Sequence, residues 1–115
     1  MNCQATTCPI QVSKTLLAAK LFRGLGDPTR LSILEALQDG PKRVVDLCQA
    51  TGRAQPNVSM HLACLRDCGL VESDPRGRET YYSLADAQMD AVLRSVKAVV
   101  DKIGPRLCEC SRYEK

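Results

Sequence analysis

The stretch Gln55-Pro-Asn-Val-Ser-Met-His-Leu-Ala-Cys-Leu-Arg-Asp-Cys68 decides how the chain is expected to fold. Pro56 stands in the first turn of a helix, where a missing N–H costs nothing, and Gly69 follows as a C-terminal cap. Three apolar residues recur at the spacing of a buried helical stripe, namely Val58, Leu62 and Leu65. The stretch therefore predicts a helix over 55–68 that packs through one face.

The remaining faces of this helix differ in chemistry. At about 100° per residue, the side opposite the stripe holds small or polar residues, namely Pro56, Ser59, Met60 and Ala63. His61, Cys64 and Cys68 fall together along one flank. The helix thus offers an open face that could enter a DNA groove and two thiols one turn apart.

The residues before this helix complete a helix-turn-helix pattern. A short helix is expected over 44–51, and Thr51-Gly-Arg-Ala54 forms the turn. A short helix, a turn containing Gly and a second helix with a small polar start are typical of this DNA-binding motif. Two earlier helices are expected, one from Ser13 to about Arg23 and one that opens at Asp27-Pro28 and ends at Gly40-Pro41.

A β-hairpin is expected directly after the helix-turn-helix. Residues 70–73 and 80–84 are β-prone, and the segment 74–79 between them is rich in turn residues. A hairpin in this position, over 70–84, is a wing. We expect Arg76 and Arg78 to project at its tip and its two tyrosines to alternate between its faces, as packing residues.

The last predicted helix, over 85–103, carries an apolar stripe that is too long for so small a domain to cover. We therefore expect it to pair with its copy in a homodimer. Gly104-Pro105 is expected to end it, which leaves a Cys-containing tail over 104–115, and residues 1–12 are expected to form a flexible arm. The predicted fold is mainly α with a small β-hairpin wing: a winged helix-turn-helix over 13–103 that dimerises through its terminal helices.

Composition narrows the class of protein. The 115 residues suit one domain, and the low aromatic content of 3% favours a helical core of aliphatic residues. No segment approaches the ~20 apolar residues of a membrane span, and the N-terminus has no apolar run typical of a signal peptide, so we expect a cytoplasmic protein. Seven cysteines in that compartment favour thiolate metal binding or redox sensing over a disulfide framework.

Four motifs together resemble the ArsR/SmtB family of winged-helix repressors, and the resemblance covers about residues 13–103, most of the chain. They are Gly26-Asp-Pro-Thr-Arg-Leu-Ser-Ile-Leu34, Gln55-Pro-Asn-Val-Ser-Met-His-Leu62, Gly69-Leu-Val71 and Gly77-Arg-Glu-Thr-Tyr-Tyr-Ser-Leu84. The resemblance implies a dimeric repressor that binds operator DNA in its apo form and dissociates when it binds a metal. It implies no enzymatic activity, no membrane and no small organic substrate.

Family members differ in where the metal binds. The arsenic and lead type uses a Cys-x-Cys, and Arg43 and Val45 stand at those positions here. The zinc type uses Asp-x-His and His-x-x-Glu in the last helix; Asp86 is present, but the other positions hold Gln88, Val99 and Lys102. The resemblance therefore implies that this chain lacks both sites.

One motif resembles that of the CmtR-type cadmium and lead sensors at the corresponding position, namely His61-Leu-Ala-Cys-Leu-Arg-Asp-Cys-Gly-Leu70. This resemblance implies metal ligation by Cys64 and Cys68, completed by the tail, where Cys108 and Cys110 are candidates. Which of these two is the ligand, and whether it acts within its own chain or on the partner, stays open. All-sulfur ligation selects soft ions, so we expect Cd(II) or Pb(II), with Hg(II) or Zn(II) as alternatives.

A mechanism follows from the position of the thiols on the reading helix. A tail thiol that ties this helix to the dimerisation layer would change the spacing of the two reading helices. That spacing must match adjacent major grooves, which are about 34 Å apart. Metal binding and DNA binding would then oppose each other.

The candidate DNA contacts fall into two groups. The reading face is expected to comprise Gln55, Asn57, Ser59, Met60 and His61, whereas contacts to phosphates or the minor groove are expected from Lys42, Arg43, Arg53, Arg76 and Arg78. Ala54 stands where the family commonly has a Ser or Thr cap, a change worth roughly 1 kcal/mol.

Several alternatives remain open at this point. Cys48 lies on an apolar face and is expected in the core, Cys3 and Cys8 form either a second soft-metal site or none, and His61 could be a ligand. A rival function is thiol-redox sensing, in which Cys64 or Cys68 forms a disulfide with a tail cysteine. A second rival is a thiol enzyme or metal carrier, but the single His lies on the reading helix and no Cys-x-x-Cys occurs.

Overall fold

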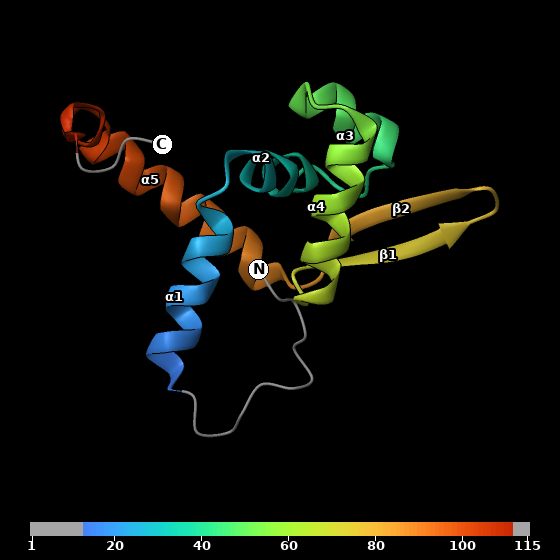
Figure 1. Cartoon of the computed structure of the whole chain (residues 1–115), viewed down its shortest axis with the longest axis horizontal. Coiled ribbons are helices and arrows are strands. Elements are labelled where there is room, and N and C mark those ends of the chain that lie inside the picture. Colours follow the sequence, from blue (N-terminus) through green and yellow to red (C-terminus); the bar gives the residue numbers. More distant parts are fainter. Residues whose placement is uncertain (1–12, 112–115) are drawn as a thin grey trace.

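The computed structural model describes residues 13–111, which form five helices and one hairpin (Figure 1). In chain order the elements are α1 (Lys14–Leu25), α2 (Pro28–Leu37), α3 (Val44–Thr51), α4 (Gln55–Asp67), β1 (Val71–Arg76), β2 (Glu79–Leu84) and α5 (Ala87–Glu109). The hairpin and the terminal helices α1 and α5 extend to opposite sides of α2 and α4. In this part of the chain, no helix is long and apolar enough to cross a membrane.

Side-chain caps start the first two helices where the sequence predicts. Ser13 Oγ accepts a hydrogen bond of 3.1 Å from the backbone N–H of Leu16, and Asp27 Oδ1 accepts one of 2.8 Å from that of Thr29. The helix α1 continues to Leu25, past its expected end. Ala54 precedes α4 in an extended conformation and supplies no side-chain cap, so the start of the reading helix lacks this stabilisation.

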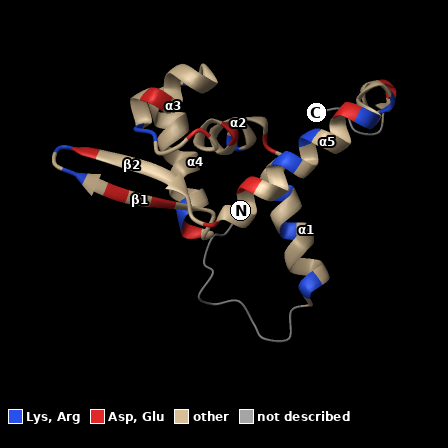
Figure 2. Ribbon diagram, turned by 180° about the vertical axis from the view of Figure 1, so that it is seen from behind, with Lys and Arg blue, Asp and Glu red and all other residues tan. Residues whose placement is uncertain are grey.

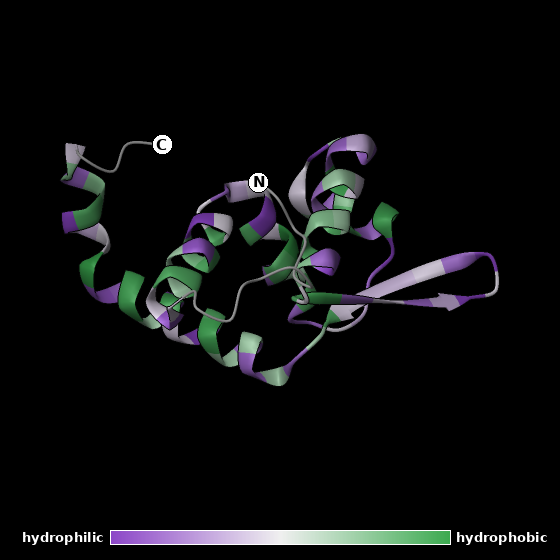
Figure 3. Cartoon of the chain, turned by 60° about the horizontal axis from the view of Figure 1, so that its bottom comes forward, coloured by the Kyte–Doolittle hydropathy of each residue, from purple (hydrophilic) through white to green (hydrophobic). Residues whose placement is uncertain are grey.

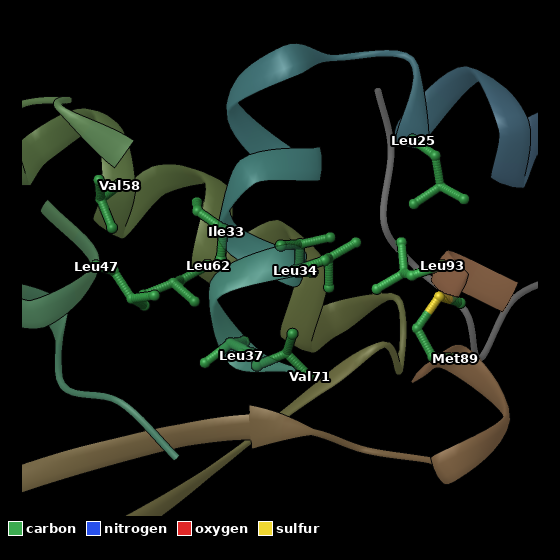
Figure 4. Close-up of a cluster of buried hydrophobic side chains, with 11 residues drawn as sticks. Leu25, Ile33, Leu34, Leu37, Leu47, Val58, Leu62, Val71, Met89 and Leu93 are labelled. Atoms are coloured by element: carbon green, nitrogen blue, oxygen red, sulfur yellow. The ribbon is translucent and has the colours of Figure 1, made fainter. Parts of the chain in front are cut away.

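The core forms around α2, which packs against α3, α4 and the wing (Figure 4). Ile33, Leu34 and Leu47 are fully buried, and the predicted stripe of α4 is buried with them. Cys48 packs against this core, as expected. Val45, one of the apolar residues of α3, does not pack there, since half of its surface is exposed.

The wing is a regular antiparallel hairpin with longer strands than the sequence predicts. Register runs from Val71 opposite Leu84 to Arg76 opposite Glu79. Only Gly77 and Arg78 form the turn, and Gly77 takes the positive φ of +64° that such a tight turn demands. Pro75 does not end β1, because in a two-stranded ribbon both strands are edges and need no complete ladder.

A pair of backbone hydrogen bonds attaches the base of the wing to the segment before α3. The backbone N–H of Lys42 donates to the carbonyl of Tyr82 at 2.9 Å, and the N–H of Tyr82 donates back at 2.8 Å. Tyr82 also packs against the core. The base of the wing is therefore held against the segment that precedes α3.

The last helix departs from expectation at its end. It continues through Gly104 and Pro105 to Glu109 instead of stopping at 103. A proline removes one backbone N–H from the hydrogen-bond ladder, but the flanking turns keep the helix intact here. Residues 104–109, half of the predicted tail, are consequently the end of α5.

Only the first part of α5 is covered by its own chain. Met89 and Leu93 are buried, and Gln38 Nε2 donates a hydrogen bond of 2.9 Å to Asp90 Oδ1, which ties α5 to α2. Figure 3 shows hydrophobic residues along both terminal helices. Apart from Met89 and Leu93 of α5 and Leu25 of α1, their large apolar residues are exposed. They are Leu16, Leu17, Leu21 and Phe22 of α1, and Val92, Val96, Val99, Val100, Ile103 and Leu107 of α5. We refer to this set as the apolar terminal face.

Candidate metal centre and DNA-binding surface

The outer face of α4 is accessible at its N-terminal end. Gln55 is exposed, 61% of Met60 is exposed, and Asn57 and Ser59 are half-buried. Gln55 Nε2 donates a hydrogen bond of 3.0 Å to Ser59 Oγ, one turn along the helix. These predicted reading residues therefore share one helix and remain open to a ligand.

His61 does not lie on this open face. Its side chain is buried, Arg30 Nε donates a hydrogen bond of 3.1 Å to its Nδ1, and its Nε2 lies 3.8 Å from Asp27 Oδ2. The base contact predicted for His61 is not supported by this geometry, because both ring nitrogens face the start of α2. The sequence did hold the signal, since position 61 is three residues after Val58 and four before Leu65.

Arg43 is held by two carboxylates. Its Nη2 lies 3.0 Å from Asp46 Oδ1 and its Nη1 lies 3.0 Å from Glu79 Oε2. Hydrogen bonds to these groups raise the pKa of Arg43, and the side-chain hydrogen bond from Arg43 lowers the pKa of Asp46. A phosphate contact would compete with both carboxylates, so the phosphate contact predicted for Arg43 gives way to a link between α3 and the wing.

The wing carries both charge signs (Figure 2). Arg76 Nε donates a hydrogen bond of 2.9 Å to Asp74 Oδ2, and its guanidinium carbon lies 4.6 Å from the ring centroid of Tyr81. The side chain of Arg76 is thus directed back along the hairpin instead of projecting from its tip. Arg78 is exposed in the turn of the hairpin, and Arg53 is exposed in the turn before α4.

Cys64 lies in the last turn of α4, and Cys68, four residues later, is the C-cap, because the helix ends at Asp67 and not at 68. Cys68 is exposed and free. Cys64 is half-buried and disulfide-bonded, whereas Cys48, Cys108 and Cys110 are free. Cys3 and Cys8, the candidates for a second site, lie outside the described residues.

The tail cysteines lie at the far end of α5. The beginning of α5 is close to the end of α4, because the N–H of Ala85 donates to the carbonyl of Leu70 at 3.1 Å. Cys108 lies in the last turn of α5, which places it about 30 Å along the helix axis from that point. Between residues 13 and 111, no group of three or more His, Cys, Asp or Glu side chains is arranged to hold a metal ion. A site made of Cys64, Cys68 and a tail thiolate therefore requires the tail of a second subunit.

Comparison with known proteins gives the family. Residues 27–73 match the profile of bacterial regulatory proteins of the arsR family. The chain is 43% identical over 94 residues to the HTH-type transcriptional regulator CmtR of Mycobacterium tuberculosis, an alignment that covers 82% of this chain and 77% of that protein. It is 33% identical over 94 residues to a probable mercury resistance operon repressor of Streptomyces lividans, with coverages of 82% and 75%.

The fold agrees with these relatives. A solution structure of a homodimeric winged helix-turn-helix DNA-binding domain from Mycobacterium bovis, a possible ArsR-family regulator, matches with a TM-score of 0.69 and 29% identity. The match covers 82% of this chain and 92% of that one. On the strength of this fold, the identity to CmtR and the matched profile, the chain belongs to the ArsR family of bacterial regulatory proteins and is a DNA-binding transcriptional regulator, not an enzyme.

Proposed function

We propose that this protein is a cytoplasmic, homodimeric repressor that binds operator DNA without metal and releases it when a soft metal ion binds its cysteines. Cd(II) or Pb(II) is the proposed effector, with Hg(II) or Zn(II) as alternatives. The observation that carries the proposal is the position of Cys64 and Cys68, one turn apart on the helix that bears the reading surface. Metal ligation at these residues acts directly on the element that contacts DNA.

The two thiols suit a shared ion. Side chains four residues apart on a helix have Cβ atoms about 5–6 Å apart, and two metal–sulfur bonds of about 2.3 Å span that gap. Cys64 must be in its reduced form to contribute a thiolate. Within one chain, the length of α5 separates the tail cysteines from α4. We therefore assign the third ligand to Cys108 or Cys110 of the partner subunit.

The apolar terminal face supports the dimer that such a site needs. It exposes aliphatic side chains along both α1 and α5, and α5 carries the tail cysteines at its end. A second copy that covers this face would bring its own tail towards the first copy. The resulting dimer presents two reading helices to successive major grooves of the operator.

Metal would then link α4 of one subunit to α5 of the other. This link fixes the separation of the reading helices at a value that DNA disfavours. Because the coupling is a free energy shared by both ligands, DNA must weaken metal binding by the same factor by which metal weakens DNA binding.

Thiol-redox sensing is a second candidate, favoured by one observation: Cys64 is disulfide-bonded. The pairing with a tail cysteine that the sequence suggested is not present, since Cys108 and Cys110 are free. In this alternative, dithiothreitol without any metal changes DNA affinity, and metal added to the reduced protein does not.

Fluorescence anisotropy on promoter DNA tests the proposal. Reduced apo-protein is bound to the DNA and titrated with Cd(II) and Pb(II), alongside Cys64→Ser, Cys68→Ser and a Cys108→Ser/Cys110→Ser double variant. Cys48→Ser is the matched control, because that thiol packs against the core. Release of the wild type and the control, but not of the other variants, is expected. A reduced protein that stays on DNA at saturating metal contradicts the proposal.

Mixed dimers test the assignment of the tail ligand to the partner. One chain carries Cys64→Ser/Cys68→Ser and the other carries Cys108→Ser/Cys110→Ser. A site built across the dimer is complete once in the mixed species and absent from either parent. We therefore expect the mixed dimer to bind Cd(II) and the two parent dimers not to bind it. If the mixed dimer also fails to bind Cd(II), the ligands of one site come from a single chain.

A further inference from the structure

The amide of Gln55 is held in place before any DNA is present. Its Nε2 donates a hydrogen bond of 3.0 Å to Ser59 Oγ, and the two residues lie four apart on the same face of α4. Gln55 is the first residue of that helix and is exposed. The N-terminal residues of a reading helix are those that reach base edges in the major groove, so the fixed amide stands where a base would be read.

The hydrogen bond to Ser59 determines what the amide still offers. A glutamine amide has two N–H donors and one carbonyl acceptor. With one N–H donated to Ser59, Gln55 retains one donor and the acceptor Oε1. This pair is complementary to adenine, which presents the N6 donor and the N7 acceptor in the major groove, whereas guanine presents two acceptors there.

We propose that Gln55, positioned by Ser59, reads an adenine of an A·T pair in each operator half-site. The proposal rests on the DNA-binding function and adds the base that this residue selects. Ser59 acts as a positioning residue, because a side chain ordered in advance loses less freedom when it binds. Because Nε2 is the atom engaged with Ser59, Oε1 stays available to accept from N6.

Selection of bound duplexes from a random-sequence library provides the first test. The reduced apo-protein is expected to select an A·T pair at one position of each half-site. Gln55→Ala is expected to lose that preference and keep the others. Asp67→Asn is the matched control, because Asp67 is exposed at the other end of the same helix, away from the reading face; it should keep the preference.

Atomic substitution in the selected duplex provides the second test. Replacement of the adenine by 7-deazaadenine removes N7 and should weaken binding by wild type and by Asp67→Asn about tenfold. Gln55→Ala should bind both duplexes equally. In Ser59→Ala, the loss of affinity caused by 7-deazaadenine should be smaller than the tenfold loss of the wild type but larger than the absent loss of Gln55→Ala.

The outcomes separate this inference from the function on which it rests. Two results would overturn the reading of adenine by Gln55. One is selection of a defined site in which no A·T preference depends on Gln55. The other is an equal loss of affinity with 7-deazaadenine in wild type and Gln55→Ala. Full discrimination in Ser59→Ala overturns the positioning role. No selection of any sequence would instead contradict the DNA-binding function.

Discussion

Arg30 Nε donates a hydrogen bond of 3.1 Å to Nδ1 of His61, and this bond joins the start of α2 to the middle of the reading helix. The imidazole accepts through Nδ1 and directs Nε2 towards Asp27, the residue that caps α2. Since α2 follows α1 after a two-residue link, the contact connects the reading helix to the layer that carries the apolar terminal face.

His61→Ala should destabilise the fold by about 1–3 kcal/mol, because it leaves a partly buried hydrogen bond from Arg30 unmade. Urea unfolding measures this change, and DNA affinity measured well below the unfolding midpoint should fall less than for Gln55→Ala. Loss of DNA binding with unchanged stability would instead mean that His61 contacts a base.

Glu79→Gln should loosen the wing. It removes the carboxylate that Arg43 Nη1 contacts at 3.0 Å, while the backbone bridge between Lys42 and Tyr82 remains. Hydrogen exchange of the amides in β2 should become faster. The matched control is Glu72→Gln, which removes an exposed carboxylate on the other strand. Equal exchange in both variants would rule out a role for the Arg43–Glu79 pair.

The capping interaction at the start of α3 should depend on pH. The hydrogen bonds from Arg43 lower the pKa of Asp46 in the folded state. A lowered pKa means that this stabilisation is present above the ordinary pKa of an aspartate and is lost as the pH falls through the lowered value. A carboxyl NMR titration should show Asp46 protonating at higher pH in Arg43→Gln than in the wild type. Identical titration curves would contradict the interaction.

Ile103→Glu should dissociate the dimer, because it places a charge within the apolar terminal face. Sedimentation should show a monomer with unchanged helix content, and operator affinity should fall steeply. Lys102→Glu is the control, since it adds a carboxylate at the neighbouring polar position of α5. A dimer that tolerates Ile103→Glu would place the dimer interface elsewhere.

Ala54→Ser should stabilise the protein by about 1 kcal/mol, because Ala54 already has the extended φ and ψ of a capping residue but supplies no acceptor. Thermal or urea unfolding measures the gain. A glycine at the same position supplies no side-chain acceptor, and Ala54→Gly is the comparison. An unchanged unfolding midpoint in Ala54→Ser would mean that the hydroxyl does not reach the backbone.

Local patterns in the sequence predicted most of the fold. The Ser13 and Asp27 caps, the α4 stripe and the short α3 are all encoded within one or two helical turns. The end of α5 could not be predicted in this way, because whether Pro105 ends or merely interrupts a helix depends on the turns on either side of it.

The candidate site was less predictable, because its contacts join residues that are distant in sequence. Arg43 meets Glu79 from 36 positions away, and Arg30 meets His61 from 31 positions away. No local pattern indicates such pairs, so the sequence alone assigned Arg43 and His61 to the DNA-contacting residues. The two thiols of α4 were predictable because their spacing is itself local.

The most direct measurement is the affinity of the reduced dimer for Cd(II) with and without saturating operator DNA, followed through the thiolate-to-metal absorption band. Linkage requires DNA to weaken Cd(II) binding by the same factor by which Cd(II) weakens DNA binding. We expect both factors to exceed about tenfold, in line with typical coupling free energies of 1–3 kcal/mol, and to vanish together in Cys68→Ser. Equal Cd(II) affinity in the free and DNA-bound dimers would show that the thiols of the reading helix do not control DNA binding.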